Sequence, residues 1–364
     1  MNKLTNGWTE YKLKDLCVIN YGKGLGKSNI VNGNIPVYSS GGIIGFHNTY
    51  NVNSEGVIIG RKGNAGSVFY SDKPFFCIDT AFYIEPNNQY DLKYLFYKLV
   101  SMNLKNHKTG TAIPGLIRND IYKLSISIPP LDEQKRIASA LSKIDAYLEN
   151  TIKLIEEKER FKRGIAKKLL TCKEGENIPE ARFKGFEDEW KTKTLENICK
   201  NIKTGKLNAN AMEKDGQYRF YTCAKDYYKI NTYAFDGEAI LISGNGAHVG
   251  YVHYYNGKFN AYQRTYVLMD FTENILFIKY YLDIHLKYKI NIENNKGNIP
   301  YIVLNTIKDM EIKFPSLEEQ EKIGGYLSLL DAEIDNLKKQ KELIKEMKRG
   351  AMQKLLSGEV RLLD

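Results

Sequence analysis

Apolar residues recur at three- and four-residue spacing in two long segments of the chain. In the first segment they are Ile137, Leu141, Ile144, Leu148, Ile152 and Ile155, and in the second Ile323, Leu327, Leu330, Ile334 and Leu337. This spacing places them on one face of a helix. A proline precedes each segment and acidic residues fill each first turn, as the helix dipole favours. We therefore predict helices over residues 131–171 and 317–357, each roughly 60 Å long at 1.5 Å per residue.

The two predicted helices are copies of one another. PLDEQKRIASALSKIDAYLEN from Pro130 matches PSLEEQEKIGGYLSLLDAEIDN from Pro315, and KRGIAKKLL from Lys162 matches KRGAMQKLL from Lys348. Aligned at Leu131 and Leu317, the match runs without a gap at an offset of 186 residues. Long helices with a narrow apolar seam are typical of a coiled coil, here an antiparallel pair. Two unrelated helices packed on separate cores are the alternative, but the shared KRG…KLL ends argue against it.

The segments before each helix repeat more weakly. GWTEYKLKDLC, which contains Trp8, resembles EWKTKTLENIC, which contains Trp190. Both segments contain short β-branched and aromatic runs with glycine turns, which indicate strands, and helices follow Asp91 and begin near Ile275. We predict an α+β fold with a pseudo-twofold internal repeat. Mixed α/β domains over 1–130 and 190–316 alternate with the two helices, with a linker at 172–189 and a tail at 358–364.

Composition and charge narrow the class of protein. No apolar run approaches the roughly 20 residues of a membrane span, the first residues lack a signal-peptide core, and the five cysteines are scattered. We therefore expect a cytoplasmic protein. The formal net charge is +10, of which residues 1–130 contribute +6 and residues 190–316 contribute +5. A basic excess on the two globular segments favours duplex DNA as the partner.

No enzyme motif survives inspection. YGKGLGKS, residues 21–28, has a tyrosine where a phosphate-binding loop needs its first glycine, and turn-rich sequence follows where a helix should begin. The chain lacks the N/D-P-P-Y/F tetrad of a base methyltransferase. Glu133 and Lys135 resemble a nuclease E-x-K, but the repeated copy has lost the lysine. His248 and His253 are expected on opposite faces of a strand, which disfavours a metal site. We expect a non-catalytic chain without metal or cofactor.

The P-L-x-E-Q helix starts, the K-R-G…K-L-L helix ends and the alternation with divergent globular segments resemble the specificity subunit of a type I restriction–modification system. The resemblance covers essentially the whole chain. It implies two target-recognition domains, each reading one half of a split DNA site, and helices that fix the spacer and dock partners. It also implies two modification subunits that methylate adenine with S-adenosylmethionine, and restriction subunits that use ATP and Mg²⁺.

Polar and basic loops after strands are the candidate DNA contacts. Arginine can read guanine and lysine can contact phosphate. In the first globular segment the candidates are Lys23, Lys27, Tyr38, Ser39, Ser40, Arg61, Lys62, Asn64, Lys108 and Thr109. In the second they are Tyr221, Lys225, Asn245, His248, Arg264, Lys296 and Asn298. An ordinary solvated turn is the alternative for each loop.

Three other functions remain open at this point: a two-headed helical adaptor for proteins, a stand-alone DNA-binding repressor, and an NTPase that uses the loop at residues 21–28. DNA binding would weaken steeply with salt, unlike adaptor binding. A repressor would bind its site tightly without partners. In the specificity-subunit interpretation, the pseudo-twofold axis matches the local twofold symmetry of a duplex. A 60 Å spacer then limits the half-site separation to about 18 base pairs at 3.4 Å each.

Overall fold

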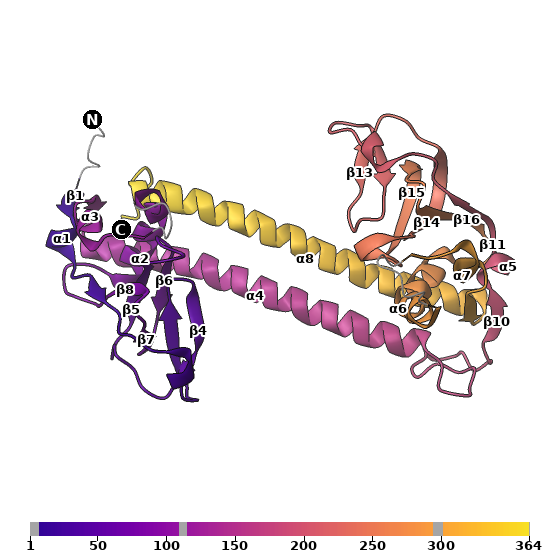
Figure 1. Cartoon of the computed structure of the whole chain (residues 1–364), viewed down its shortest axis with the longest axis horizontal. Coiled ribbons are helices and arrows are strands. Elements are labelled where there is room, and N and C mark those ends of the chain that lie inside the picture. The colour runs from indigo at the N-terminus through magenta and orange to yellow at the C-terminus, as the bar shows by residue number, and fades with distance from the viewer. Residues whose placement is uncertain (1–6, 109–114, 294–300, 364) are drawn as a thin grey trace. The chain divides into compact units, whose positions relative to one another are not determined.

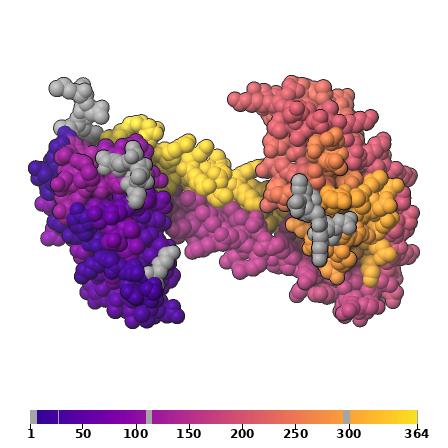
Figure 2. Space-filling model, viewed as in Figure 1, coloured from indigo at the N-terminus to yellow at the C-terminus, as the bar shows by residue number. Residues whose placement is uncertain are grey.

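The computed structural model describes residues 7–108, 115–293 and 301–363. The chain divides into two units. Unit 1 comprises Met1–Ile152 and Lys339–Asp364, and unit 2 comprises Lys153–Lys338. Each unit therefore contains one globular segment and one part of each long helix. Figure 1 shows the strands of each unit packed beside segments of the long helices, and Figure 2 shows the same view with all atoms filled in.

Unit 1 is built from short strands in small sheets. The sheet orders are β1-β9, β2-β8-β5-β6 and β4-β3-β7. The strands are β1 (Thr9–Lys12), β2 (Asn20–Tyr21), β3 (Ile35–Ser39), β4 (Gly42–His47), β5 (Gly56–Gly60), β6 (Val68–Ser71), β7 (Phe76–Cys77), β8 (Ala81–Ile84) and β9 (Ser125–Ile128). The short helices are α1 (Leu13–Leu16), η1 (Lys27–Asn29), α2 (Leu92–Ser101), η2 (Leu104–His107) and α3 (Arg118–Tyr122).

The core of unit 1 lies between α2 and the sheet that contains β5. The Asp91 carboxylate caps α2 by accepting from the Tyr94 amide at 2.8 Å, as N-cap residues do. β5 is buried along its whole length, because α2 packs against β5 and β6. Burial raises the pKa of the Cys17 and Cys77 thiols to about 12, so both thiols stay protonated.

Unit 2 has one larger sheet with the order β11-β16-β14-β15-β12-β13, beside the pair β10-β17. The strands are β10 (Lys191–Thr194), β11 (Cys199–Thr204), β12 (Tyr218–Tyr221), β13 (Tyr228–Ile230), β14 (Phe235–Ser243), β15 (Val252–Ala261), β16 (Thr265–Phe271) and β17 (Glu311–Phe314). The short helices are α5 (Leu195–Ile198), η3 (Ala209–Ala211), η4 (Gly246–His248), α6 (Ile275–Glu293) and α7 (Leu304–Lys308).

The two faces of the larger sheet have different cores. Alternate residues of β14 point to opposite faces, so Ile240 and Ile242 join the main core with Phe277 of α6, while Ala239 and Leu241 do not. Ala239 and Leu241 instead form a smaller core with Tyr221 of β12 and aromatic neighbours. The core on the second face is therefore made by side chains from strands of the same sheet.

The long helices are α4 (Leu131–Leu170) and α8 (Leu317–Ser357), which confirms the predicted α+β fold with two long helices (Figure 1). In unit 2, Lys158 pairs with Glu333 at 2.7 Å and Lys162 pairs with Asp331. The partner number falls as the first number rises, so the segments are antiparallel. This pairing confirms the prediction from the apolar seam.

The internal repeat is visible in the contacts around these helices. In unit 2 the Tyr280 hydroxyl donates to Asp331 at 2.6 Å, and in unit 1 the Tyr97 hydroxyl donates to Asp145 at 2.7 Å. Lys348 pairs with Asp145 at 2.5 Å as Lys162 pairs with Asp331. Burial raises the pKa of Asp331, whereas the hydrogen bonds from Lys162 and Tyr280 lower it. The net effect is a pKa below the usual value of an aspartate. The same three-residue network therefore joins a globular segment to both long helices in each unit.

The repeated Glu-Gln pair at the start of each long helix is structural. Glu133 is 1% exposed, and its carboxylate accepts two hydrogen bonds from the Arg361 guanidinium, each at 2.7 Å. Likewise, Glu319 is 0% exposed and accepts two hydrogen bonds from the Arg182 guanidinium, each at 2.8 Å. Bidentate pairing of this kind fixes a buried carboxylate. The sequence analysis explained these acidic residues by the helix dipole alone. The structure adds that an arginine anchors each glutamate. The buried ion pairs also account for Glu133 without nuclease chemistry.

The adjacent glutamine closes each helix start in the same way. Gln134 donates to the Pro129 carbonyl and accepts from the Asp91 amide, each at 2.9 Å. Gln320 donates to the Pro315 carbonyl and accepts from the Asn274 amide, each at 3.0 Å. The L-x-E-Q sequence shared by both helix starts therefore joins each long helix to the first turn of α2 or α6.

Candidate DNA interface

Three loops of unit 1 meet at Thr80. The turn after β3 reaches it through the Ser40 amide, which donates to the Thr80 hydroxyl at 3.4 Å. The loop after β5 reaches it through the Arg61 amide, which donates to the Thr80 carbonyl at 2.8 Å. A third segment joins because the Leu116 amide donates to the Arg61 carbonyl at 2.8 Å. The ends of separate strands thus form one polar loop cluster, which we call the unit 1 loop cluster.

Both backbone polar groups of Arg61, the amide and the carbonyl, are hydrogen-bonded in this cluster. Its side chain also has fixed partners. The guanidinium donates to the Asp79 carbonyl at 3.2 Å and lies over the Tyr21 ring at 4.9 Å. The guanidinium of Arg118 lies over the same ring at 4.6 Å. Among the described residues, no carboxylate pairs with either guanidinium. Two arginines without a carboxylate partner therefore lie over one tyrosine ring.

Unit 2 has a loop cluster with the same backbone hydrogen bonds. The Gly244 amide donates to the Arg264 carbonyl at 2.9 Å, and the Ile302 amide donates to the Gly244 carbonyl at 2.8 Å. The Cys223 thiol reaches the Arg264 carbonyl at 3.3 Å from the loop after β12. These bonds bring together the loops after β12, β14 and β15, which we call the unit 2 loop cluster.

The two clusters correspond position by position. The Arg61 amide donates to the carbonyl of Thr80, which directly precedes β8. The Gly244 amide donates to the carbonyl of Arg264, which directly precedes β16. Two further pairs of bonds also match. Gly22 to Ala81 corresponds to Gly205 to Thr265, and Ile78 to Tyr38 corresponds to Tyr262 to Tyr221. The backbone frame is therefore shared, whereas the side chains on it differ.

Glycine is required in the loop that begins each cluster. A Cβ atom on Gly22 would lie 2.0 Å from the Ile78 carbonyl oxygen, and one on Gly205 would lie 1.9 Å from the Ala261 carbonyl oxygen. Neither backbone oxygen can move without breaking the frame. The glycines of YGKGLGKS therefore serve close packing at Gly22, and the stretch continues into η1, which is only three residues long. A phosphate-binding loop followed by a helix is not present there.

The structure gathers several of the predicted contacts of unit 1. Ser39, Ser40, Arg61, Lys62 and Asn64 all lie in the unit 1 loop cluster, and Lys62 and Asn64 are exposed. The Ser39 hydroxyl donates to the Gly42 carbonyl at 3.1 Å and so closes the turn.

The other predicted DNA contacts of unit 1 lie beside or away from the unit 1 loop cluster. The Lys23 amide donates to the Cys77 carbonyl at 2.9 Å, and the Lys23 side chain is exposed beside the cluster. Lys27 lies in η1, Lys108 is exposed after η2, and Thr109 lies outside the described residues.

In unit 2, Asn245 and Arg264 lie in the loop cluster, with Arg264 exposed and Asn245 paired with Tyr301. Lys225 is exposed on the loop after β12, and His248 is half-buried in η4. Lys296 and Asn298 lie outside the described residues.

Two predicted contacts prove to be core residues. Tyr38 is 7% exposed, and its hydroxyl reaches the Tyr70 carbonyl at 3.3 Å. Tyr221 is 2% exposed and packs in the smaller core of the unit 2 sheet. Burial raises the pKa of both hydroxyls. Each ring is packed in the core next to its loop. The burial of both side chains therefore contradicts the prediction that they contact DNA.

The sequence prediction missed residues that the frame brings into the clusters. In unit 1 these are Tyr21 and Arg118, which stack with Arg61. In unit 2 they are Lys206, which is exposed, and Tyr301, which is 49% exposed and bridges to Asn245. One signal could have found Lys206, because Gly205-Lys206 repeats the dipeptide Gly22-Lys23 at the same place in the second half.

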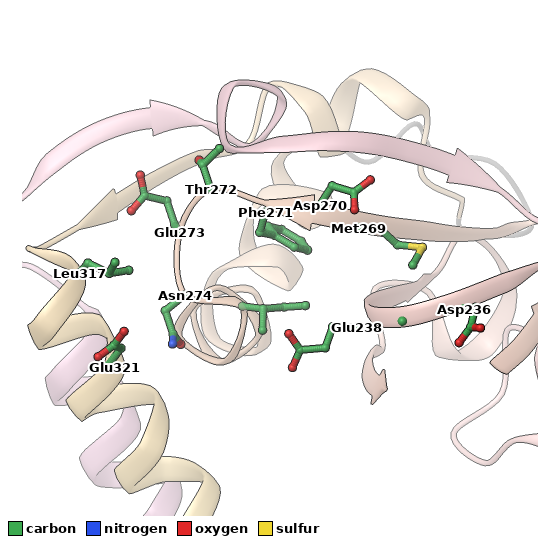
Figure 3. Close-up of a pocket in the computed structure, with 12 residues that line it drawn as sticks. Asp236, Glu238, Met269, Asp270, Phe271, Thr272, Glu273, Asn274, Leu317 and Glu321 are labelled. Atoms are coloured by element: carbon green, nitrogen blue, oxygen red, sulfur yellow. The ribbon is translucent and has the colours of Figure 1, made fainter. Parts of the chain in front are cut away.

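A recess of about 480 Å³ in unit 2 has the opposite character (Figure 3). Five acidic residues line it: Asp236, Glu238, Asp270, Glu273 and Glu321. Glu273 pairs with Lys193 at 3.3 Å and accepts from Gln320 at 2.9 Å. Carboxylates repel a phosphodiester backbone, so this recess is separate from the candidate DNA interface.

Comparison with known proteins agrees with the fold. The family described as type I restriction modification DNA specificity domain matches residues 5–157 and 187–346. The chain therefore belongs to this family, and its function is DNA sequence specificity in a restriction–modification system. This confirms the resemblance drawn from the repeated helices. None of the described helices is long and apolar enough to cross a membrane.

Individual relatives support the same family. The EcoDI specificity subunit of Escherichia coli is 41% identical over 46% of this chain and 37% of its own length. A putative type I specificity subunit from Mycoplasma genitalium is 26% identical over 97% of this chain and 95% of its own. The crystal structure of an S subunit from M. genitalium has a TM-score of 0.72 at 22% identity, covering 98% of this chain and 97% of that one, and shows the shared fold.

Proposed function

We propose that each unit reads one half of a bipartite DNA site through its loop cluster, and that the chain itself carries out no chemistry. The observation that supports this most is the shared backbone frame with different side chains in the two units. A shared frame presents both clusters to DNA in an equivalent pose, while different side chains select different base pairs. In unit 1 the reading residues are Arg61, Lys62 and Asn64, with Ser39 and Ser40 beside them. In unit 2 they are Arg264, Asn245 and Lys225, with Lys206.

The roles of these side chains follow from their chemistry. The planar fork of an arginine donates two hydrogen bonds to the O6 and N7 atoms of guanine in the major groove. Arg61 is preorganised for this by Tyr21 and by its bond to the Asp79 carbonyl. The exposed lysines, including Lys23, contact phosphates and supply affinity without sequence information.

The long helices act as a spacer in this proposal. α4 and α8 are continuous over 40 and 41 residues, so their lengths set the distance between the half-sites. Inserting one helical turn into both helices should change the preferred spacer and leave both half-sites readable. Mapping the methylated sites of the variant measures this, and an unchanged spacer would contradict the role of the helices.

Catalysis in this proposal belongs to partner subunits. Two modification subunits methylate adenine with S-adenosylmethionine, and restriction subunits use ATP and Mg²⁺. The repeat supports two equivalent docking positions, because Phe161 of α4 and Met347 of α8 occupy the same repeat position and are 52% and 49% exposed. Apolar side chains exposed at equivalent places fit two copies of one partner.

The experiment that tests the proposed function is the mapping of methylated adenines in DNA exposed to this chain with its modification partner. The expected result is one bipartite sequence with a fixed spacer. Binding should also weaken steeply as salt rises, which an adaptor for proteins would not show. Tight specific binding by the chain alone would instead indicate a repressor.

A further inference from the structure

A second recess of unit 2, on strands that precede the loop cluster, is basic where the recess of Figure 3 is acidic. It has a volume of about 410 Å³ and lies between β12, β13 and β15. Its described lining has three cations and three tyrosines and no acidic residue: Arg219, Lys229, Lys258, Tyr218, Tyr227 and Tyr255. β13 is the edge strand of its sheet, so the recess opens at a free edge (Figure 1).

Arg219 is held rigidly in this recess. Its guanidinium lies 4.3 Å from the ring centroids of both Tyr227 and Tyr255, and it donates to the Tyr221 hydroxyl at 3.2 Å. The ammonium of Lys258 lies over the Tyr233 ring at 4.7 Å. Among the described residues, no carboxylate pairs with Arg219, Lys229 or Lys258. Three cations without an ion pair line one hollow, which favours an anion there, and stacked aromatic rings orient the arginine for it.

The position of the recess favours DNA as the source of that anion. Arg219 precedes Thr222, in the loop after β12, by three residues, which is about 10 Å along a strand. That distance corresponds to roughly three base pairs of duplex at 3.4 Å each. A duplex that lies on the unit 2 loop cluster and follows β12 therefore passes within reach of the recess. This continuity with the loop cluster distinguishes the recess from a general protein-docking surface.

Among the described residues of unit 1, the corresponding strand pair carries no cation at this register. In unit 2 the strand pair β12–β13 places Arg219 opposite Lys229, and in unit 1 the corresponding pair β3–β4 places Pro36 opposite Phe46. Phe46 is exposed, whereas Pro36 is buried. Both cations are thus replaced by apolar residues at the same register, so the feature is specific to unit 2.

We propose that the recess binds phosphates of the DNA backbone outside the bases read by unit 2, so that unit 2 contacts a longer stretch of duplex than unit 1. This inference rests on the proposed function, because it requires DNA to lie on the unit 2 loop cluster. The contacts carry no sequence information and raise affinity only.

The test uses the chain with its modification partner and two duplexes that contain the mapped site. One duplex extends about ten base pairs beyond the unit 2 half-site, and the other ends at it. The double variant Lys229→Ala with Lys258→Ala removes two exposed cations and leaves the Arg219 stack intact. On the long duplex, the slope of log affinity against log salt should become shallower by about 1.8, that is about 0.9 per phosphate contact. The loss of affinity relative to wild type should therefore be roughly tenfold larger at 50 mM than at 200 mM salt.

The same variant should bind the short duplex as wild type does, and its methylation sequence should not change. The matched control is Lys200→Ala with Lys203→Ala, which removes two exposed lysines from β11 at the opposite edge of the same sheet. An unchanged salt slope on the long duplex would overturn the proposal, as would an equal loss on both duplexes. Loss of the modification partner with normal DNA binding would make the recess a protein contact and overturn it as well.

A loop variant separates this inference from the proposed function. If Arg264→Ala weakens DNA binding and the double lysine variant does not, only the recess proposal fails. If neither variant affects DNA binding, the proposed function of unit 2 fails.

Discussion

The two units hold arginine on opposite sides of the same hydrogen bond. In unit 1, Arg61 donates its amide to the Thr80 carbonyl, and in unit 2, Gly244 donates its amide to the Arg264 carbonyl. The donor position carries the arginine in unit 1 and the acceptor position carries it in unit 2. Because the bond is made by backbone atoms, either side chain can change without breaking it. In the proposed function, one fold thereby presents different base-reading groups at the same position of the backbone frame.

The units differ in a second respect, which is how the arginine is held. Arg61 is stacked on Tyr21 beside Arg118, whereas Arg264 is exposed. Unit 2 instead stacks Arg219 on Tyr227 and Tyr255, away from the loop frame. Preorganisation reduces the entropy lost on binding. We therefore expect unit 1 to discriminate more sharply at its guanine position than unit 2 does.

The largest expected effect is on the frame itself. Gly22→Ala places a Cβ atom against the Ile78 carbonyl and should destabilise unit 1 by about 1–3 kcal/mol or more, in the range of overpacked cores. The methylation sequence should lose its unit 1 half. Gly24→Ala, two residues away and with no atom within 4 Å of the new Cβ, is the matched control. Equal thermal stability of the two variants, measured by calorimetry, would contradict the shared frame.

The next effect concerns the exchanged arginines. Arg61→Lys keeps the charge and removes the fork, so discrimination at one base pair should fall by about 1–3 kcal/mol, or roughly 5- to 150-fold. Arg264→Lys should relax one base pair in the other half-site. Binding to duplexes with single base changes measures both effects. A uniform loss across all sequences would indicate that the arginine contacts phosphate instead.

Acid should affect unit 2 through two half-buried histidines. The His253 ring lies 2.9 Å from the Ala224 carbonyl, and the His285 ring lies 2.8 Å from the Leu170 carbonyl. Burial lowers the pKa of both below 6.5, so both stay neutral when folded while the unfolded chain takes up protons near pH 6.5. The stability they give is present above pH 6.5 and is lost as the pH falls below it.

The histidine contribution can be isolated by substitution. His253→Gln with His285→Gln keeps an N–H donor at each place and removes the titrating group. The melting temperature of wild type should fall more between pH 7 and pH 5 than that of the double variant. If the melting temperatures of wild type and the double variant changed identically with pH, these histidines would not contribute to the pH dependence of stability.

The helices were predictable from the sequence because their signal is repeated in side chains. The three-and-four spacing of Ile137 and Leu141 and the acids near Pro130 gave residues 131–171, and α4 spans Leu131–Leu170. The anchoring of Glu133 by Arg361 was not predictable, because the two residues are 228 positions apart in the sequence.

The loop clusters were predictable only in part. Their frame is made by backbone amides and carbonyls, which leave no residue pattern except the glycines at close contacts, such as Gly22 and Gly205. Tyr38 and Tyr221 were misassigned because tyrosine after a strand suits both a polar loop and a core, and burial decides between them. Arg118 was missed because only the fold brings it to Tyr21.

The most direct test of the account exchanges residues 1–130 for the corresponding segment of another specificity subunit. The adenines methylated by the chimaera with the modification partner are then mapped and compared with those of the parent chain. The account predicts that one half of the bipartite sequence changes, while the other half and the spacer stay the same. A change in both halves, or in neither, would contradict the claim that each unit reads its own half-site.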